Sequence, residues 1–250
     1  MRKKKESNMS LSGHLRELRN RVVICVVCLV FTFLVGLHFA PDLVELLTGM
    51  GEQYGYQYVY IAPQELLMQY FSVALIAALC IAFPVIAYNI WAFMKPGLRK
   101  NENFLIRAAL VCGLGCFVIG VLFAYYIMIP FMLHFLIDLS RGSDITASIS
   151  VQSYLTFLFS IFLIFGIIFE LPVMSVVLTQ VGILKTKWMR KGRKLIVICI
   201  FVISALVTPP DIVSQIMVAI PMIALYEVSI LISSALLKLR KKKQQDEEDI

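Results

Sequence analysis

Six long runs of apolar residues, separated by shorter polar segments, divide the chain. The runs cover residues 22–39, 66–93, 104–129, 154–178, 195–207 and 212–237. A helix needs about 20 predominantly apolar residues to cross a bilayer, and the first four runs approach or exceed that length. The fifth run makes only about 20 Å of helix, and Glu227 interrupts the sixth, so the last two helices are expected to be short. The pattern predicts an all-α polytopic membrane protein with six transmembrane helices.

The composition agrees with this prediction and excludes other classes of protein. Of the 250 residues, 60% are hydrophobic and 16% are charged, whereas soluble domains average about 45–50% and about 25%. A soluble fold of this size has no interior that could hold so much apolar surface. The same composition excludes a disordered chain and a small secreted fold held by disulfides.

The basic residues are sorted between the two sides of the predicted bundle. Of the 23 Lys and Arg residues, 22 lie before the first run, between the second and third runs or at the start of the third (Arg107), between the fourth and fifth, or after the sixth; Arg141 alone lies on the other side. Because cytoplasmic loops carry the excess of Lys and Arg, both termini are predicted to be cytoplasmic. The predicted organisation is a cytoplasmic segment at 1–21, a membrane domain at 22–237 and a charged cytoplasmic tail at 238–250. The net charge of +7 thus reflects membrane topology, and no nucleic-acid partner is expected.

One acidic residue lies deep in a predicted span. Glu170 is about 24 Å from the outer end of the fourth run, where a charged side chain costs roughly 3 kcal/mol on insertion scales. Pro172 follows and frees the carbonyl of Ile168, which weakens the helix locally. Glu170 is expected either to contact another helix or a proton-coupled group, or to be protonated and hydrogen-bonded within the protein.

Few carboxylates accompany the many bases on the predicted cytoplasmic side. Glu17 precedes the first run and points away from the apolar face of its helix. It either pairs with Arg21, one helical turn later, or remains available to a ligand. Glu102 opens the third run, where the helix N-terminus favours a carboxylate.

Polar residues also cluster in the last predicted hairpin. The segment Thr208-Pro209-Pro210-Asp211 has the composition of a helix start. A helix start does not explain Gln215 and Glu227, which lie within the sixth run. Their side chains are able to form hydrogen bonds between helices, at about 0.6 kcal/mol on average.

No enzymatic motif accompanies these residues. The chain lacks a G-x-x-x-x-G-K-[ST] phosphate loop, and its three histidines are scattered. No nucleophile with a base and no metal-ligand set is apparent, so no enzyme and no cofactor are expected. From the residues alone, one function remains open: a proton-coupled small-molecule secondary transporter that uses Glu170 and Asp211.

The motifs, taken in order, resemble those of the TatC family, the multispanning subunit of the twin-arginine protein translocase. The matching segments are His14-Leu15-x-Glu17-Leu18-Arg19-x-Arg21, Pro63-x-Glu65, Pro84 with Trp91-x-Phe93-x-x-Pro96-Gly97-Leu98-x-x-x-Glu102, Phe165-Gly166-x-x-Phe169-Glu170-x-Pro172, and Thr208-Pro209-Pro210-Asp211-x-x-x-Gln215 with Pro221 and Glu227. The resemblance covers nearly the whole chain. Each motif alone is weak, but five in register with this pattern of spans are specific.

The resemblance implies a receptor for signal peptides that carry two consecutive arginines. It assigns the contact with the signal peptide to Glu17, Arg19 and Glu102. The chemistry is consistent with this, because a guanidinium pairs with a carboxylate in a planar fork that Lys imitates poorly. Two carboxylates on an otherwise positive face would select an arginine pair.

The resemblance also implies partners, a location and an energy source. It assigns contacts with single-span subunits of the TatA and TatB type, or a polar role within the membrane, to Glu170, Gln215 and Glu227. It assigns structural roles to Pro84, Pro96, Pro172, Pro209, Pro210 and Asp211. The expected assembly is a hetero-oligomer in the lipid of the bacterial cytoplasmic (inner) membrane, driven by the proton gradient. Short last helices are expected to thin the bilayer around them.

Overall fold

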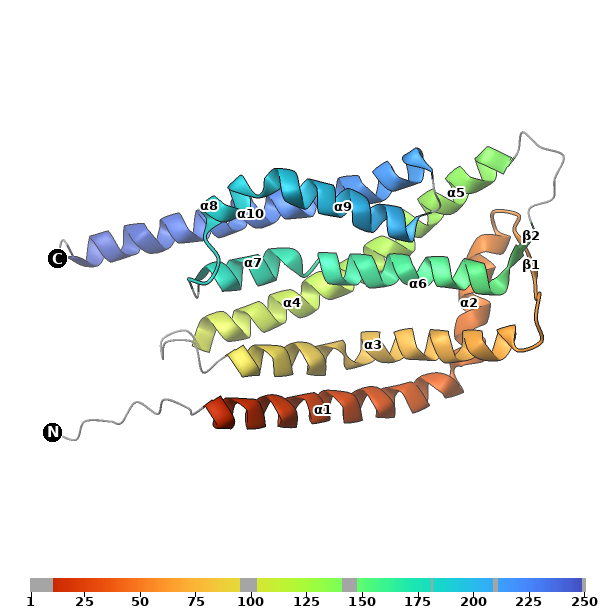
Figure 1. Cartoon of the computed structure of the whole chain (residues 1–250), viewed down its shortest axis with the longest axis horizontal. Helices are drawn as coiled ribbons and strands as arrows, with labels where there is room; N and C mark the ends of the chain where they lie inside the picture. The colour runs from red at the N-terminus through yellow and green to blue at the C-terminus, as the bar shows by residue number, and fades with distance from the viewer. Residues whose placement is uncertain (1–10, 95–102, 141–147, 181, 209–210, 249–250) are drawn as a thin grey trace.

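The computed structural model describes residues 11–94, 103–140, 148–180, 182–208 and 211–248. Its elements, in chain order, are α1 (Leu11–His38), α2 (Ala40–Glu52), β1 (Gln57–Val59), α3 (Glu65–Met94), α4 (Asn103–Phe123), the π-helix η3 (Ala124–Met128), α5 (Ile129–Ser140), β2 (Ser148–Ser150), α6 (Val151–Ile168), α7 (Leu171–Gln180), α8 (Thr186–Lys191), α9 (Arg193–Val207) and α10 (Ile212–Glu248). The fold is a bundle of long helices that run along one direction (Figure 1).

The two ends of the bundle differ in character. α1 begins, α8 begins and α10 ends at one end, which we call the basic end (Figure 1). α2, β1 and β2 lie at the opposite end, which we call the cap (Figure 1). The helices that carry the predicted spans therefore alternate in direction between the basic end and the cap.

Five helical stretches in the described residues are long and apolar enough to cross a membrane: Leu15–His38, Glu65–Ile90, Ala108–Asp138, Val151–Gln180 and Ile212–Lys238. These stretches confirm a multi-pass membrane fold. The predicted fifth span corresponds to α9, which has 15 residues and a length of about 22 Å, less than the roughly 30 Å of a hydrocarbon core. α9 lies alongside α10 (Figure 1).

The prediction that the last helix is short is wrong, because α10 has 37 residues. The polar residues after Leu237 are mostly Lys, Arg, Gln and Glu, which favour helix as strongly as most apolar residues do. A change in polarity therefore ended the predicted span without ending the helix. α1 likewise begins well before the apolar run that predicted it.

The predicted weakness near Pro172 is confirmed as a break in the fourth span. α6 ends at Ile168, and a turn at Phe169 and Glu170 precedes α7. The amide of Glu170 donates to the carbonyl of Ile167 at 3.1 Å, and helical bonding resumes from Met174 to the carbonyl of Glu170 at 2.9 Å. Pro84 and Pro221, in contrast, lie inside continuous helices.

The cap contains structure that the apolar pattern did not predict. α2 follows α1 directly, and the short strands β1 and β2 pair in parallel, with Tyr58 opposite Ile149. The hydroxyl of Tyr58 donates to the carbonyl of Thr48 at 3.1 Å, and that of Tyr56 to the carbonyl of Leu133 at 3.4 Å. Burial raises the pKa of both tyrosines, which keeps them protonated as donors. The all-α prediction is therefore corrected by one two-stranded sheet.

α6 is the central helix of the bundle. Phe165, Leu158 and Ile161 are fully buried and belong to a core that also includes η3, α5 and part of α10. α1 is the least buried span and packs mainly on α3, leaving residues such as Phe31 and Leu34 exposed. An apolar surface of this kind is stable in contact with lipid acyl chains, and not in contact with water.

Candidate functional site

Glu17 lies in the second turn of α1, at the basic end. Arg21 donates to Glu17 Oε1 from Nη2 at 2.5 Å and from Nε at 3.1 Å. Glu17 Oε2 is buried and accepts no hydrogen bond from any residue that the structure describes. Of the two arrangements open from the sequence, the pair with Arg21 has formed, but it occupies only one of the two carboxylate oxygens.

The other two predicted signal-peptide residues differ in how far the structure describes them. Arg19 is exposed on α1, two residues after Glu17. Glu102 lies outside the described residues, as do Pro96, Pro209 and Pro210. α3 ends and α4 begins at the basic end, where Glu17 also lies (Figure 1).

Glu170 lies in the break between α6 and α7, against α4. A Cβ atom on Gly113 of α4 would be 3.1 Å from Glu170 Oε2, so this glycine leaves the space that the carboxylate occupies. Glu170 Oε1 is buried and has no hydrogen-bond partner among the described residues. A buried polar atom without a partner costs free energy, and a donor from a neighbouring chain would remove that cost.

The last hairpin is held by the polar residues that the sequence singled out. Asp211 caps α10, because its Oδ1 accepts a hydrogen bond from the amide of Ser214 at 2.6 Å. Gln215 Nε2 donates to the carbonyl of Phe201 at 2.9 Å and so joins α10 to α9. The predicted helix start at Asp211 and the predicted bond between helices at Gln215 are both present.

Glu227 lies apart from Gln215. The two residues are on the same helix, about 18 Å apart along its axis. Glu227 Oε2 accepts a hydrogen bond from Arg193 Nη2 at 2.7 Å, and both side chains are well exposed. The sequence grouped these two residues as intramembrane contacts, but the structure separates them into one contact near the cap and one near the basic end.

Glu65 is a buried carboxylate that sequence reasoning did not place among the sites. Only 3% of this residue is exposed. Its Oε2 accepts from the amides of Ile61 at 2.8 Å and Ala62 at 3.4 Å. Its Oε1 accepts from the amide of Gln152 at 2.8 Å and from the hydroxyl of Ser150. The carboxylate thus joins the entries to α3 and α6, and the motif Pro63-x-Glu65 was the feature that could have identified it.

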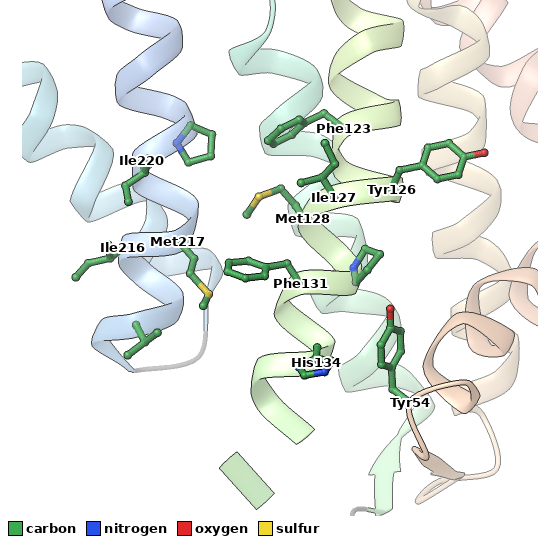
Figure 2. Close-up of a pocket in the computed structure, with 13 residues that line it drawn as sticks. Tyr54, Phe123, Tyr126, Ile127, Met128, Phe131, His134, Ile216, Met217 and Ile220 are labelled. Carbon is green, nitrogen blue, oxygen red and sulfur yellow. The ribbon is translucent and has the colours of Figure 1, made fainter. Parts of the chain in front are cut away.

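An apolar groove lies between η3 and α5 on one side and α10 on the other. Its volume is about 780 Å³, and Phe131 and Met217 point toward each other across it (Figure 2). Tyr54 and His134 lie at the end nearest the cap (Figure 2). The described residues contain no group of three or more His, Cys, Asp or Glu that could hold a metal ion. The groove is lined mainly by apolar side chains from η3, α5 and α10.

Known proteins are similar to this chain in sequence and in fold. The sequence model of the family described as Sec-independent protein translocase protein (TatC) matches residues 13–221. The TatC of Listeria innocua is 35% identical over 238 residues, which cover 91% of this chain and 92% of that protein. The TatCy of Bacillus subtilis is 32% identical over 250 residues, which cover 100% and 98%.

Comparison with solved structures gives the same result. The crystal structure of a twin arginine translocase receptor, TatC, superposes with a TM-score of 0.81 at 31% sequence identity. The match covers 89% of this chain and 98% of that one. Sequence and fold agree over almost the same length, and the chain therefore belongs to the TatC family of Sec-independent protein translocase proteins.

Proposed function

We propose that this translocase component is the receptor subunit of a twin-arginine translocase, which binds Arg-Arg signal peptides of folded precursors at the basic end. The observation that carries the proposal is the half-used carboxylate of Glu17. Arg21 occupies Oε1, while Oε2 is buried and has no partner among the described residues. An incoming guanidinium would supply the missing donors, in a fork geometry that an ammonium lacks.

The receptor site comprises Glu17, Arg19 and Glu102. The surrounding bases keep other cations away, so that a peptide gains access only where a carboxylate is available. The exposed side chain of Arg19 would repel the arginines of the peptide and so direct them toward the carboxylates of the site. The helix ends on either side of Glu102, Met94 and Asn103, lie at the same end of the bundle as Glu17, which supports a shared site (Figure 1).

The proposed topology has six spans and both termini in the cytoplasm of a bacterium, with 1–21 and 238–250 outside the membrane domain at 22–237. The sorting of Lys and Arg supports this orientation. The start of α1 and the end of α10 at one end of the bundle support it as well (Figure 1). α9 is the proposed fifth span, and its length of about 22 Å would thin the cytoplasmic membrane locally.

Glu170 is the proposed contact for single-span partner subunits of the TatA and TatB type. Gln215 and Glu227 belong to the same proposal, but their recorded bonds already link α10 to α9. Glu170 differs because one of its oxygens has no donor among the described residues, although it lies inside the span. A partner helix that presents a hydroxyl, amide or protonated group would meet this need. The resulting hetero-oligomer acts without a reaction centre in this chain and is driven by the proton gradient.

Crosslinking of a signal peptide to the membrane-embedded protein tests the receptor role. A peptide with an Arg-Arg pair should crosslink near Glu17, and Glu17→Gln or Glu102→Gln should lower the yield by about tenfold. A Lys-Lys peptide should behave like these variants. Glu45→Gln, which neutralises an exposed acid on α2 in the cap, is the matched control. Unchanged crosslinking in properly inserted Glu17 and Glu102 variants would refute the receptor role.

A further inference from the structure

A small pocket lined with basic residues lies where α8 meets α10, at the basic end. Its volume is about 270 Å³. The residues that line it are Thr186, Lys187, Arg190, Ser234, Leu237 and Lys238. Three of these residues are bases and none is an acid. The signal-peptide and partner contacts proposed above use none of them.

The pocket is organised for an anion with several oxygens. Arg190 Nη2 donates to Ser234 Oγ at 3.1 Å, which holds the guanidinium against α10. A guanidinium has five N–H donors, so one bond to a hydroxyl leaves others to bind an anion. Lys187 lies on the same side of α8 as Arg190, one turn earlier, and Lys238 lies one turn after Ser234 on α10. Guanidinium, ammonium and hydroxyl groups converging from two helices are the donors that bind phosphate.

The nearest acid on the described part of α10 does not neutralise this pocket. Glu227 is bonded to Arg193 of α9 at 2.7 Å. The net charge of the two helix ends remains positive, because α8 and the part of α10 from Ser234 to Glu248 together carry eight Lys and Arg residues against three acids, Asp246, Glu247 and Glu248. Such a charge attracts the anionic surface of a cytoplasmic leaflet.

Two observations place the pocket at the depth of lipid headgroups. Trp188 is 58% exposed, and the Nζ of Lys185 lies 5.3 Å from the centre of its ring. Exposed Trp residues concentrate at the boundary between membrane and water. The apolar stretch of α10 ends at Lys238, which is itself part of the pocket.

An apolar surface continues from the pocket toward the membrane interior. Leu231 lies three residues before Ser234 and seven before Lys238, on the face of α10 that carries the pocket, and Val228 lies about one turn before Leu231. Their exposed fractions are 62% and 42%. An acyl chain would cover these side chains while its headgroup occupied the pocket. A free phosphate ion or an acidic protein segment has no acyl chain that would cover this apolar surface.

We propose that the pocket between α8 and α10 binds the phosphate headgroup of an anionic phospholipid, with an acyl chain along Leu231 and Val228. The bound lipid would hold α8 and the basic end of α10 at a fixed depth. This site is separate from the signal-peptide site and does not depend on the receptor role.

Fluorescence quenching tests the proposal on a chain with an intact pocket. The sequence has two Trp residues, and Trp91→Phe leaves Trp188 as the only one. The variant is reconstituted in mixed vesicles in which either phosphatidylglycerol or phosphatidylcholine carries brominated acyl chains at equal mole fraction. Brominated phosphatidylglycerol should quench Trp188 at least about twofold more strongly, since a bound anionic lipid raises its local concentration. Equal quenching by the two lipids would overturn the proposal.

A matched pair of double variants locates the site. Arg190→Gln with Lys238→Gln should lower the amount of phosphatidylglycerol retained by the detergent-purified chain by about tenfold. Lys191→Gln with Lys194→Gln removes the same charge from exposed residues outside the pocket and should change retention less than about twofold. Equal losses in both pairs would show diffuse attraction and refute the pocket. Displacement of the lipid by millimolar inorganic phosphate would assign the site to a free ion and overturn the proposal. If the purified chain shows no preference for phosphatidylglycerol, an acidic protein segment would remain as the ligand, which also overturns the proposal.

Discussion

The carboxylate of Glu170, in the break between α6 and α7, packs against Gly113 of α4. A methyl group at Gly113 would lie 3.1 Å from Glu170 Oε2, so the absence of a side chain on one helix sets the position of a carboxylate on another. The other oxygen of that carboxylate has no donor among the described residues. Close packing on α4 thus limits the position of this intramembrane acid on one side, and its other oxygen is buried and still lacks a donor among the described residues.

The first prediction concerns the association with single-span partners. Glu170→Gln should lower the amount of co-purified partner by about threefold to tenfold, since an amide has one acceptor oxygen instead of two and accepts a weaker bond than a carboxylate does. Gly113→Ala should act in the same direction but more weakly, because the carboxylate moves by a few tenths of an ångström. The measurement is partner recovery after affinity purification in mild detergent.

Gly115→Ala provides the control for this prediction. Gly115 is on the same helix, and apart from the neighbouring backbone of that helix no atom of the described residues lies within 4 Å of the position of its Cβ. The substitution should leave partner recovery unchanged. If Gly113→Ala and Gly115→Ala reduce recovery equally, the effect belongs to α4 in general and the pairing with Glu170 does not matter for assembly.

The second prediction concerns Glu65 and the cap. Glu65→Gln should lower the melting temperature by several degrees, because an amide presents one acceptor oxygen to the four donors from Ile61, Ala62, Ser150 and Gln152. Hydrogen exchange should increase in 57–62 and 148–153 and stay unchanged in α9. Glu52→Gln, at the exposed end of α2, is the control and should have little effect. A cap that keeps its protection in Glu65→Gln would contradict this role.

The apolar pattern predicted the five long spans, and Pro172 predicted the local weakness of the fourth, because both depend on residues close together in sequence. It did not predict the pairing of β1 with β2 or the burial of Glu65, whose bond to Gln152 joins residues 87 positions apart. The pairing of Arg193 with Glu227 likewise requires the packing of α9 on α10. Helical spacing did predict the bond between Glu17 and Arg21, but it could not predict that one oxygen would remain without a donor.

The third prediction concerns the pair formed by Arg193 and Glu227. Both side chains are more than a third exposed, so the pair should contribute only about 0.2–1 kcal/mol to stability. Glu227→Arg alone or Arg193→Glu alone should lower the melting temperature slightly, and the two changes together should restore it. A double-variant cycle measures this coupling directly. A loss well above that range for a single change, not recovered in the double variant, would indicate a further contact of Glu227.

The fourth prediction concerns competition at Glu17. Arg21 donates twice to Glu17 Oε1 and so occupies half of the carboxylate that an arginine of a signal peptide would use. Arg21→Gln should free that oxygen and increase the affinity for an Arg-Arg peptide by about threefold to tenfold, whereas Glu17→Gln should decrease it. Peptide affinity is measured by fluorescence anisotropy on the reconstituted protein. Arg16→Gln is the control, because it removes the same charge from an exposed position on α1. If Arg16→Gln and Arg21→Gln increase affinity equally, relief of general repulsion explains the effect, and the internal pair does not compete with the peptide.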